Sequence, residues 1–428
     1  MKRLLWIPAV LLVIVLAGGW WLSRQPRQLP AQAEDPVIAA KLKDPEVIAQ
    51  GRYLATVGDC VSCHTLRGGQ SFAGGRMLPT PFGSIPAPNI TPDAETGIGD
   101  WSFQDFWRAL HDGMGRNGEP LYPAFSYTSF TKVDRDDAIA IFAYLRSLRP
   151  THQPNAAPTL RFPYNLRSTL TAWRAVYFKA GTYRPDASQS ASWNRGAYLV
   201  QGLGHCNECH AARGAWGGLE ASATLSGGRI PEQGWYAPDL STQANGGLTG
   251  WSRQDIIAVL KTGQASKGVA VGPMADVVAG STQYLREDDL QAIADYLLSL
   301  PARAAQAPTR ANFNAQSLIS RGNVVYGERC EKCHGKNGAG IAGVYPPLDG
   351  NASVVEPTGI NATRVVLLGG FSPLTAGNAR PYSMPPYAQQ LSDGDVAAVV
   401  TYIRQAWSNH AAAVQERDVA AYRHTPID

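Results

Sequence analysis

Six cysteines in three identically spaced pairs constrain this 428-residue chain more than any other feature. The pairs are Cys60 and Cys63, Cys206 and Cys209, and Cys330 and Cys333, and each second cysteine is followed directly by a histidine, namely His64, His210 or His334. Histidine makes up only 8 of the 428 residues, so chance does not account for its place after all three pairs. The chain therefore carries three copies of the pattern C-x-x-C-H.

This pattern is the attachment site of c-type haem. Its two thiols form thioethers with the haem vinyl groups, and the next residue supplies an imidazole to the iron. A disulfide framework gives no reason for the histidines, and a zinc ribbon needs its second cysteine pair about 15–20 residues after the first. A thioredoxin-like motif needs a βαβ context, which is missing here. The sequence therefore predicts three covalent haem c groups.

Each motif lies inside a longer repeat. A helix is expected to lead into each motif, at 51–54, 195–199 and 321–326, and an amphipathic helix beginning with an acidic residue is expected to close each repeat, at 137–144, 289–296 and 395–402. Proline and glycine are frequent between motif and closing helix, which predicts long loops. The fold class predicted is mainly α and loop-rich, with three tandem class I cytochrome c-like domains and an N-terminal transmembrane helix.

The predicted organisation has six parts: an N-terminal membrane anchor or signal (1–30), cytochrome c domain 1 (46–150), an interdomain segment (151–190), cytochrome c domain 2 (191–302), cytochrome c domain 3 (315–410) and a C-terminal tail (411–428). Leu4–Leu22 has no charged residue, which suits an uncleaved anchor better than a signal peptide, although a cleaved signal stays open. Both alternatives export the rest of the chain. The aromatic residues of the interdomain segment predict a packed helix, with contact to lipid or a partner as the alternative.

A second axial ligand sets the redox behaviour of each iron, and methionine raises the potential. Met384, in a proline-stiffened loop, and Met274, the only methionine of its repeat, are the predicted ligands of the third and second haems. In the first repeat we choose Met114, with Met77, His111 and an open or water-bound iron as alternatives. The other histidines are expected at the surface: His152, His205, His410 and His424.

Charge gives little guidance to partners. The formal net charge of +4 is spread along the chain without a basic block, so nucleic-acid binding is not expected. Three haems would add six propionates, which reverses the sign of that charge. We also find no dinucleotide fingerprint, so the chain is expected not to be an enzyme on its own.

Together these features resemble the membrane-bound three-haem cytochrome c subunits of periplasmic dehydrogenases. Beyond the motifs, the resemblance rests on Thr80–Gly83, Asn89–Asp93, Glu95–Gly99, Leu121–Ala124, Gly234–Asp239, Gly272–Met274, Pro346–Asn351 and Met384–Pro386. The alcohol-dehydrogenase type carries Met after Tyr-Pro-Ala, whereas this chain has Phe125. That variant resembles subunits paired with molybdopterin hydroxylases of aldehydes or N-heterocycles.

The resemblance implies an electron-transfer subunit at the periplasmic side of the inner membrane. Its expected partners are a catalytic dehydrogenase subunit (molybdopterin type first, quinoprotein alcohol or flavoprotein gluconate type next), a small iron-sulfur subunit, and ubiquinone or the respiratory chain as acceptor. The alternative function is a haem reductase or peroxidase acting at an open first haem.

Overall fold

The computed structural model describes residues 34–220, 224–243, 246–302, 315–423 and 425. Its contacts divide the chain into two compact units. One contains the chain up to Arg52 together with Leu66–Leu78 and Phe82–Tyr183, and the other contains Tyr53–Thr65, Pro79–Pro81 and everything from Arg184 onward. The second and third repeats therefore share one unit, which also includes the first C-x-x-C-H motif.

The first repeat is helical, with one small sheet. Its elements are α2 (Pro36–Lys41), α3 (Pro45–Val57), β1 (Met77–Thr80), β2 (Gly83–Pro86), α5 (Phe103–Asp112), α6 (Tyr127–Phe130), α7 (Arg135–Ser147), β3 (Thr159–Leu160) and α8 (Thr169–Tyr177). The three strands form a sheet in the order β1-β2-β3, with β2 antiparallel to β3 and Gly83 opposite Leu160. The first motif follows α3 directly, as α4 (Cys60–Cys63).

The second and third repeats are also helical, with short antiparallel hairpins between the helices. The second contains α9 (Ala191–Tyr198), the π-helical η1 (Leu199–Leu203), α10 (Asn207–His210), β4 (Gly228–Ile230), β5 (Trp235–Ala237), β6 (Thr242–Gln243), β7 (Gly246–Gly247), α11 (Arg253–Thr262), β8 (Gln264–Ala265), β9 (Gly268–Val269), α12 (Pro273–Gly280), the 3₁₀ turn η3 (Thr282–Tyr284) and α13 (Glu287–Leu298). The third contains α14 (Gln316–Arg329), α15 (Glu331–His334), α16 (Ala352–Val355), α17 (Ile360–Leu368), β10 (Gly370–Phe371), β11 (Ser383–Met384), α18 (Asp393–Gln405) and α19 (Glu416–Arg423).

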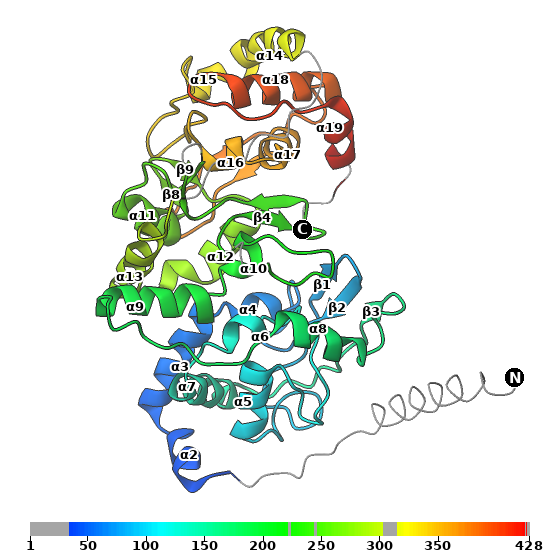
Figure 1. The fold of residues 1–428 in the computed structure, drawn as a ribbon, viewed down its shortest axis with the longest axis vertical. Helices are drawn as coiled ribbons and strands as arrows, with labels where there is room; N and C mark the ends of the chain where they lie inside the picture. Colours follow the sequence, from blue (N-terminus) through cyan, green and yellow to red (C-terminus); the bar gives the residue numbers. More distant parts are fainter. Residues whose placement is uncertain (1–33, 221–223, 244–245, 303–314, 424, 426–428) are drawn as a thin grey trace, which may run out of the picture. The chain divides into compact units, whose positions relative to one another are not determined.

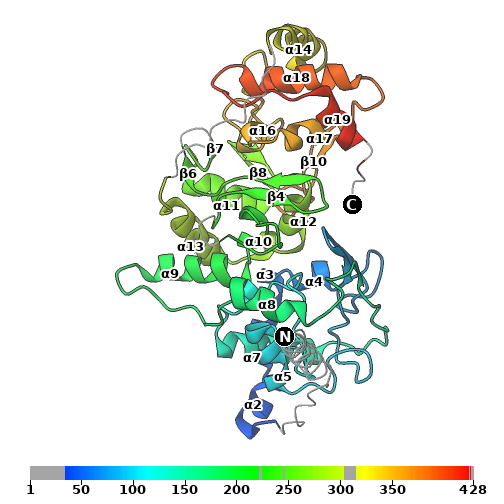
Figure 2. The same cartoon turned by 45° about the vertical axis from the view of Figure 1, so that its right-hand side comes forward.

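The opening and closing helices of every repeat cross at a glycine. A Cβ atom added to Gly51, Gly196 or Gly322 would lie 1.8, 1.9 or 2.1 Å from the carbonyl oxygen of Ala140, Ala292 or Ala398. Only glycine permits backbones to approach this closely. The crossings join α3 to α7, α9 to α13 and α14 to α18, and Figures 1 and 2 show the last two pairs side by side. This contact confirms the predicted opening and closing helices.

An arginine–aspartate pair fastens the crossing in the second and third repeats. Arg195 Nε lies 2.7 Å from Asp289 Oδ1, and one terminal guanidinium nitrogen of Arg321 lies 2.7 Å from Asp395 Oδ1. Burial raises the pKa of Asp289, but bonds from Arg195 and Tyr53 outweigh this effect and hold that pKa below 3.8. An aspartate in the first turn of each of these closing helices therefore also ties the opening helix to it.

The C-terminal residues belong to the core of the third repeat. The sequence predicted a tail over 411–428, but α19 packs against α17 and α18. Val414 and Val419 are 2% and 0% exposed and join the core formed by Val325, Leu367 and Val400. Burial of these apolar side chains accounts for the order of this segment.

Helix α8, in the predicted interdomain segment, packs against other elements of the first repeat. In α8, Leu170 is buried, and the ring of Trp173 lies 6.4 Å from that of Tyr127 on α6. Arg174 donates to the carbonyl of Gly113 at 3.2 Å. Phe162 and Val176 remain 78% and 73% exposed. The predicted helix is present, and its described contacts are with the first repeat.

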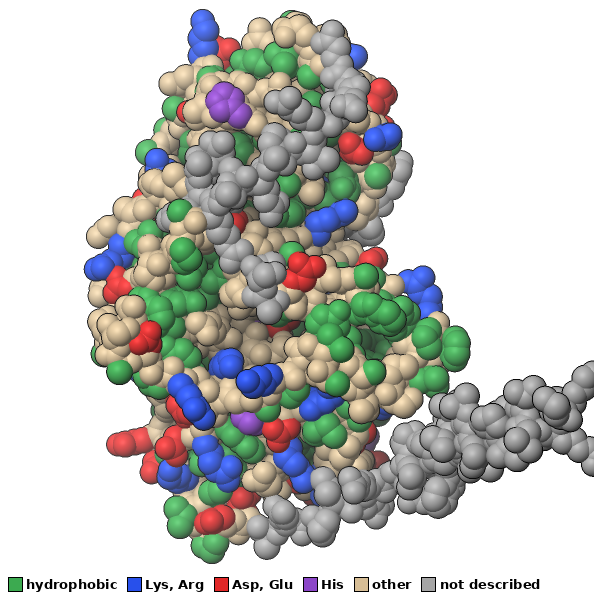
Figure 3. Space-filling view, viewed as in Figure 1, with side chains coloured by type: hydrophobic (Ala, Val, Ile, Leu, Met, Phe, Trp, Pro, Cys, Tyr) green, Lys and Arg blue, Asp and Glu red, His purple; other side chains and the backbone are tan. Residues whose placement is uncertain are grey.

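Two predictions concern the membrane and charge. Among the described residues, no helix combines the length and apolar character needed to cross a bilayer, and the predicted segment Leu4–Leu22 lies outside them. Figure 3 shows basic and acidic side chains intermingled on the visible face. That mixture agrees with the absence of a basic block from the sequence.

Candidate functional site

Each C-x-x-C-H motif folds as one helical turn. The backbone N–H of the histidine donates to the carbonyl of the first cysteine in all three: His64 to Cys60 at 3.0 Å, His210 to Cys206 at 2.9 Å, and His334 to Cys330 at 3.0 Å. A single turn places the two sulfurs of a pair on one side. The local geometry therefore matches the spacing expected from the sequence.

No disulfide joins any of the six cysteines, all of which lie among the described residues. Burial raises the pKa of Cys60 and Cys206 to about 12, and that of Cys209 and Cys330 to about 11. These four thiols are therefore neutral at physiological pH. Within the described residues, no three His, Cys, Asp or Glu side chains gather in a way that could hold a metal ion.

A proline carbonyl orients the imidazole in the second and third motifs. The Nδ1 atom of His210 lies 2.7 Å from the carbonyl oxygen of Pro238, and Nδ1 of His334 lies 3.1 Å from that of Pro346. Because a carbonyl only accepts, Nδ1 carries the proton and Nε2 keeps its lone pair for a metal. Burial lowers the pKa of both imidazoles, which favours the neutral form that binds iron.

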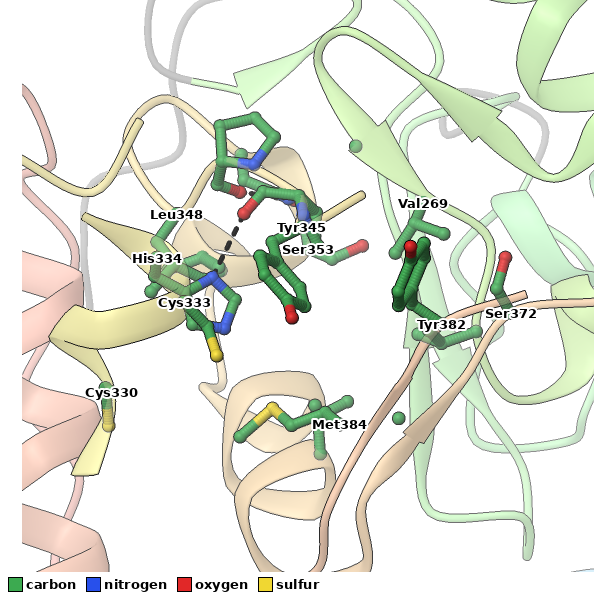
Figure 4. A pocket seen from close by; sticks show the side chains of 18 of the residues that line it. Val269, Cys330, Cys333, His334, Tyr345, Leu348, Ser353, Ser372, Tyr382 and Met384 are labelled. Atoms are coloured by element: carbon green, nitrogen blue, oxygen red, sulfur yellow. Dashed lines mark hydrogen bonds between the residues drawn. The ribbon is translucent and has the colours of Figure 1, made fainter. Parts of the chain in front are cut away.

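The third motif borders a cavity of about 260 Å³. Its walls include Cys330, Cys333, His334 and the predicted sixth ligand, Met384. Figure 4 shows the His334 imidazole and the Met384 thioether facing the same space, with Tyr382 across it. Met384 lies in β11, which pairs with β10. The structure thus brings together all four residues that the sequence assigned to the third haem.

The other predicted methionines lie in different surroundings. Met274 is in the first turn of α12 and is half-buried. Met114 follows the C-terminal cap of α5 and forms an isolated bridge with Pro120. Met77 begins β1 and is 43% exposed.

Two further side chains of the first repeat bear on its sixth ligand. His111 stacks on Trp107, with ring centroids 4.6 Å apart, and its Nδ1 lies 2.7 Å from Asp112. Phe125 packs on Phe130 at 5.4 Å. The sixth ligand of the first haem therefore remains a prediction.

The first motif contacts the second repeat within their common unit. His205, expected at the surface, is half-buried, and its Nε2 lies 3.2 Å from the carbonyl oxygen of Gly58. Ser281 donates its hydroxyl to the carbonyl of Val57 at 3.2 Å. The segments that carry the first and second cysteine pairs are therefore joined directly, and the expectation for His205 was wrong.

The donor set fits haem c. Thiols paired within one helical turn, the His210 and His334 imidazoles held through Nδ1, and a cavity lined by His334 and Met384 suit thioether attachment and axial ligation. Sequence reasoning missed Pro238 and Pro346, because they follow their histidines at different distances of 28 and 12 residues. The shared signal was a proline in the loop after each motif. The second-repeat residues that line the third cavity gave no sequence signal.

Comparison with known proteins gives one family. The sequence profile described as cytochrome c matches residues 48–149, 194–301 and 319–407. The cytochrome c subunit of alcohol dehydrogenase (quinone) from Gluconobacter oxydans is 37% identical over 398 residues, covering 89% of this chain and 83% of that protein. The gluconate 2-dehydrogenase cytochrome c subunit of Pantoea cypripedii is 38% identical over 396 residues, covering 88% of this chain and 89% of that protein.

A third relative is much longer than this chain. It is a subunit of the nicotinate dehydrogenase of Pseudomonas putida, and it is 41% identical over 363 residues, which cover 84% of this chain. The match spans only 30% of that protein. The similarity therefore concerns one part of the relative.

Proposed function

Because the chain belongs to the cytochrome c family and is a cytochrome subunit of the dehydrogenase type, we propose that it passes electrons singly through three covalent haem c groups. Each haem would be attached at Cys60 and Cys63, Cys206 and Cys209, or Cys330 and Cys333. Haem iron supplies the one-electron chemistry, cycling between its ferrous and ferric states. The chain supplies attachment, axial ligands and an apolar surrounding.

The arrangement at the third motif carries this proposal. His334, with Nε2 available, and the Met384 thioether line one cavity, with the cysteine pair at its wall. A His–Met pair favours a six-coordinate iron of raised potential, which suits electron transfer. His64 and His210 would serve the other two irons, with Met274 at the second and Met114 at the first.

The electron donor is proposed to be a catalytic dehydrogenase subunit, accompanied by a small iron-sulfur subunit. The molybdopterin type is favoured by Phe125 and by 41% identity to a relative that bears the name of nicotinate, an N-heterocycle. The quinoprotein alcohol and flavoprotein gluconate types come next, supported by relatives with those substrates in their names. Ubiquinone is the proposed acceptor, and the periplasmic side of the inner membrane the proposed location.

Mass analysis and a reduction assay test this function. The mature chain should carry three tetrapyrrole masses that persist under denaturing conditions, and each cysteine pair changed to alanine should remove one. The holo chain should also be reduced by its co-purified dehydrogenase when that enzyme's substrate is added. A chain without tetrapyrrole mass, or one that stays oxidised beside an active dehydrogenase, contradicts the proposal.

A haem enzyme working at the first iron is the second candidate. Phe125 stands where the alcohol-dehydrogenase type carries a ligand methionine, and it packs on Phe130. A five-coordinate high-spin spectrum with peroxide turnover by the purified chain would favour this candidate, and its absence would exclude it.

A further inference from the structure

The cavity beside the third motif is walled by two repeats. Gln264, Gly268, Val269 and Val271, from the hairpin β8–β9 and the residues after it, line it together with third-repeat residues. A Cβ atom on Gly268 would lie 3.5 Å from Asn351 Nδ2, and one on Gly370 would lie 4.0 Å from Val271 Cγ1. Figure 4 shows Val269 and Tyr382 on the side of the cavity opposite His334. The third haem site is therefore completed by the second repeat.

The same wall continues directly into the predicted ligand of the second haem. Only Gly272 and Pro273 separate Val271 from Met274. Gly272 has φ +57° and ψ −140°, and a Cβ atom there would lie 2.6 Å from Cε2 of Trp235. Only glycine fits this conformation and this contact. The short link is thus held in a fixed shape against the Trp235 ring.

A second link joins the support of His210 to the third repeat. On β5, the backbone N–H of Tyr236 donates to Asn361 Oδ1 at 2.9 Å, and Asn361 Nδ2 donates to the Tyr236 carbonyl at 2.7 Å. Asn361 is 4% exposed and lines the third cavity. Two residues after Tyr236, the Pro238 carbonyl accepts from His210. The segments that carry Met274 and Pro238 therefore each contact, or contribute, residues that line the third cavity.

Trp235, the residue before Tyr236 on β5, connects these two links. The guanidinium of Arg364, on α17, lies over the Trp235 ring, 5.0 Å from its centroid. The ring also meets Gly272, as described above. Trp235 therefore packs the link to Met274 against the third repeat, and its position depends on both repeats.

We propose that Trp235–Pro238 and Val269–Met274 form the route by which an electron passes between the second and third haems, with Asn361 as a positioning residue. This inference rests on the proposed function. One electron leaves the ferrous iron of the second site, which becomes ferric, and reduces the ferric iron of the third site to ferrous. No bond is made or broken, and no proton moves. Short covalent links favour such a transfer because electronic coupling falls steeply across gaps.

The variant Asn361→Ala tests the positioning role in the full-length holo chain. Alanine cannot form either hydrogen bond to Tyr236. The fraction of molecules in which β5 is separated from α17 should therefore rise by roughly 30-fold, the equivalent of about 2 kcal/mol. Hydrogen exchange at the Tyr236 amide should speed up accordingly. The matched control is Asn337→Ala, because the Asn337 side chain accepts from the Ala339 amide within its own loop.

The electron route is tested by photoreducing each variant with less than one electron per chain and following redistribution among the haems. Asn361→Ala and Trp235→Leu should slow the exchange between the second and third haems, while Trp235→Phe and Asn337→Ala should stay near the wild-type rate. Redox titration and electron paramagnetic resonance check that all three irons keep their ligands and potentials. If Asn361→Ala does not bind haem, the rate of exchange between the second and third haems in Trp235→Leu tests the route instead.

Wild-type exchange rates in variants with intact haems would overturn the route. That result leaves the proposed function standing, because the wild-type chain would still be reduced by its dehydrogenase. Conversely, a wild-type chain that no dehydrogenase reduces contradicts the function, while flash-induced exchange still reports on the route.

Discussion

A methyl group added at Gly322 tests the helix crossing that defines each repeat. Its Cβ atom would lie 2.1 Å from the carbonyl oxygen of Ala398 and 2.7 Å from Cβ of Tyr402. Overpacking costs about 1–3 kcal/mol, and we take the upper end because the obstacle is backbone. Alanine regains about 1 kcal/mol of helix propensity over glycine. Gly322→Ala should therefore destabilise the third repeat by about 2 kcal/mol.

The same helix provides the control. Gly327 also lies in α14, but a Cβ atom there meets nothing nearer than Glu331 Oε2 at 3.9 Å. Gly327→Ala should therefore stabilise the helix by up to about 1 kcal/mol, because only the propensity gain remains. The two variants make the same chemical change and should move stability in opposite directions.

Urea unfolding of the holo chain, read by hydrogen exchange in α14 and α18, measures both effects. Exchange resolved by segment is needed because a chain of several repeats does not unfold in two states. The protection of α14 should fall in Gly322→Ala and rise in Gly327→Ala. Equal protection in the two variants would refute the close-crossing argument.

Three further predictions concern ligation, a buried cation and acid stability. Met384→Ala should lower the midpoint potential of the third haem and abolish its sulfur-to-iron absorption, and Met274→Ala should do so for the second; an unchanged redox titration would contradict the ligand assignment. Arg404 is fully buried and donates to three backbone carbonyls, so Arg404→Met should cost about 3 kcal/mol in urea unfolding, one for each orphaned carbonyl; a cost no larger than for an exposed arginine would disprove this role. In the folded state, the pKa of Asp289 is lowered from its ordinary value of 3.8. Its bond to Arg195 therefore contributes its full stabilisation at pH values above 3.8, and this stabilisation is lost as the pH falls through the lowered pKa. Acid unfolding of Asp289→Asn should lack this component, and an identical acid transition in the variant would contradict it.

Local features of the fold could be predicted from the sequence. The turn at each motif, the opening helices and the amphipathic closing helices depend on hydrogen bonds and apolar spacings within a few residues. The cysteine pairs and histidines of the candidate site follow from the same short-range pattern. The sequence also predicted Met384, in a proline-rich loop before a closing helix, as a ligand, and the structure places this residue in the wall of the third cavity.

Contacts between distant segments could not be predicted in this way. The two-residue strands β8 and β9 are too short to show a periodic pattern, yet they wall the third cavity. The Pro238 and Pro346 carbonyls follow their histidines by 28 and 12 residues, so no fixed spacing along the chain marks their role. The segment that contains α19 was expected as a tail, whereas Val414 and Val419 join the core of the third repeat.

The sequence by itself thus determined what chemistry the chain can hold, since covalent haem attachment needs only two thiols and an imidazole within one turn. Tertiary structure decided how the second and third sites share walls, and how the first and second cysteine-pair segments meet. That division follows from range: a helical turn is fixed by neighbours along the chain, whereas Tyr236 and Asn361 meet only after the second and third repeats have packed.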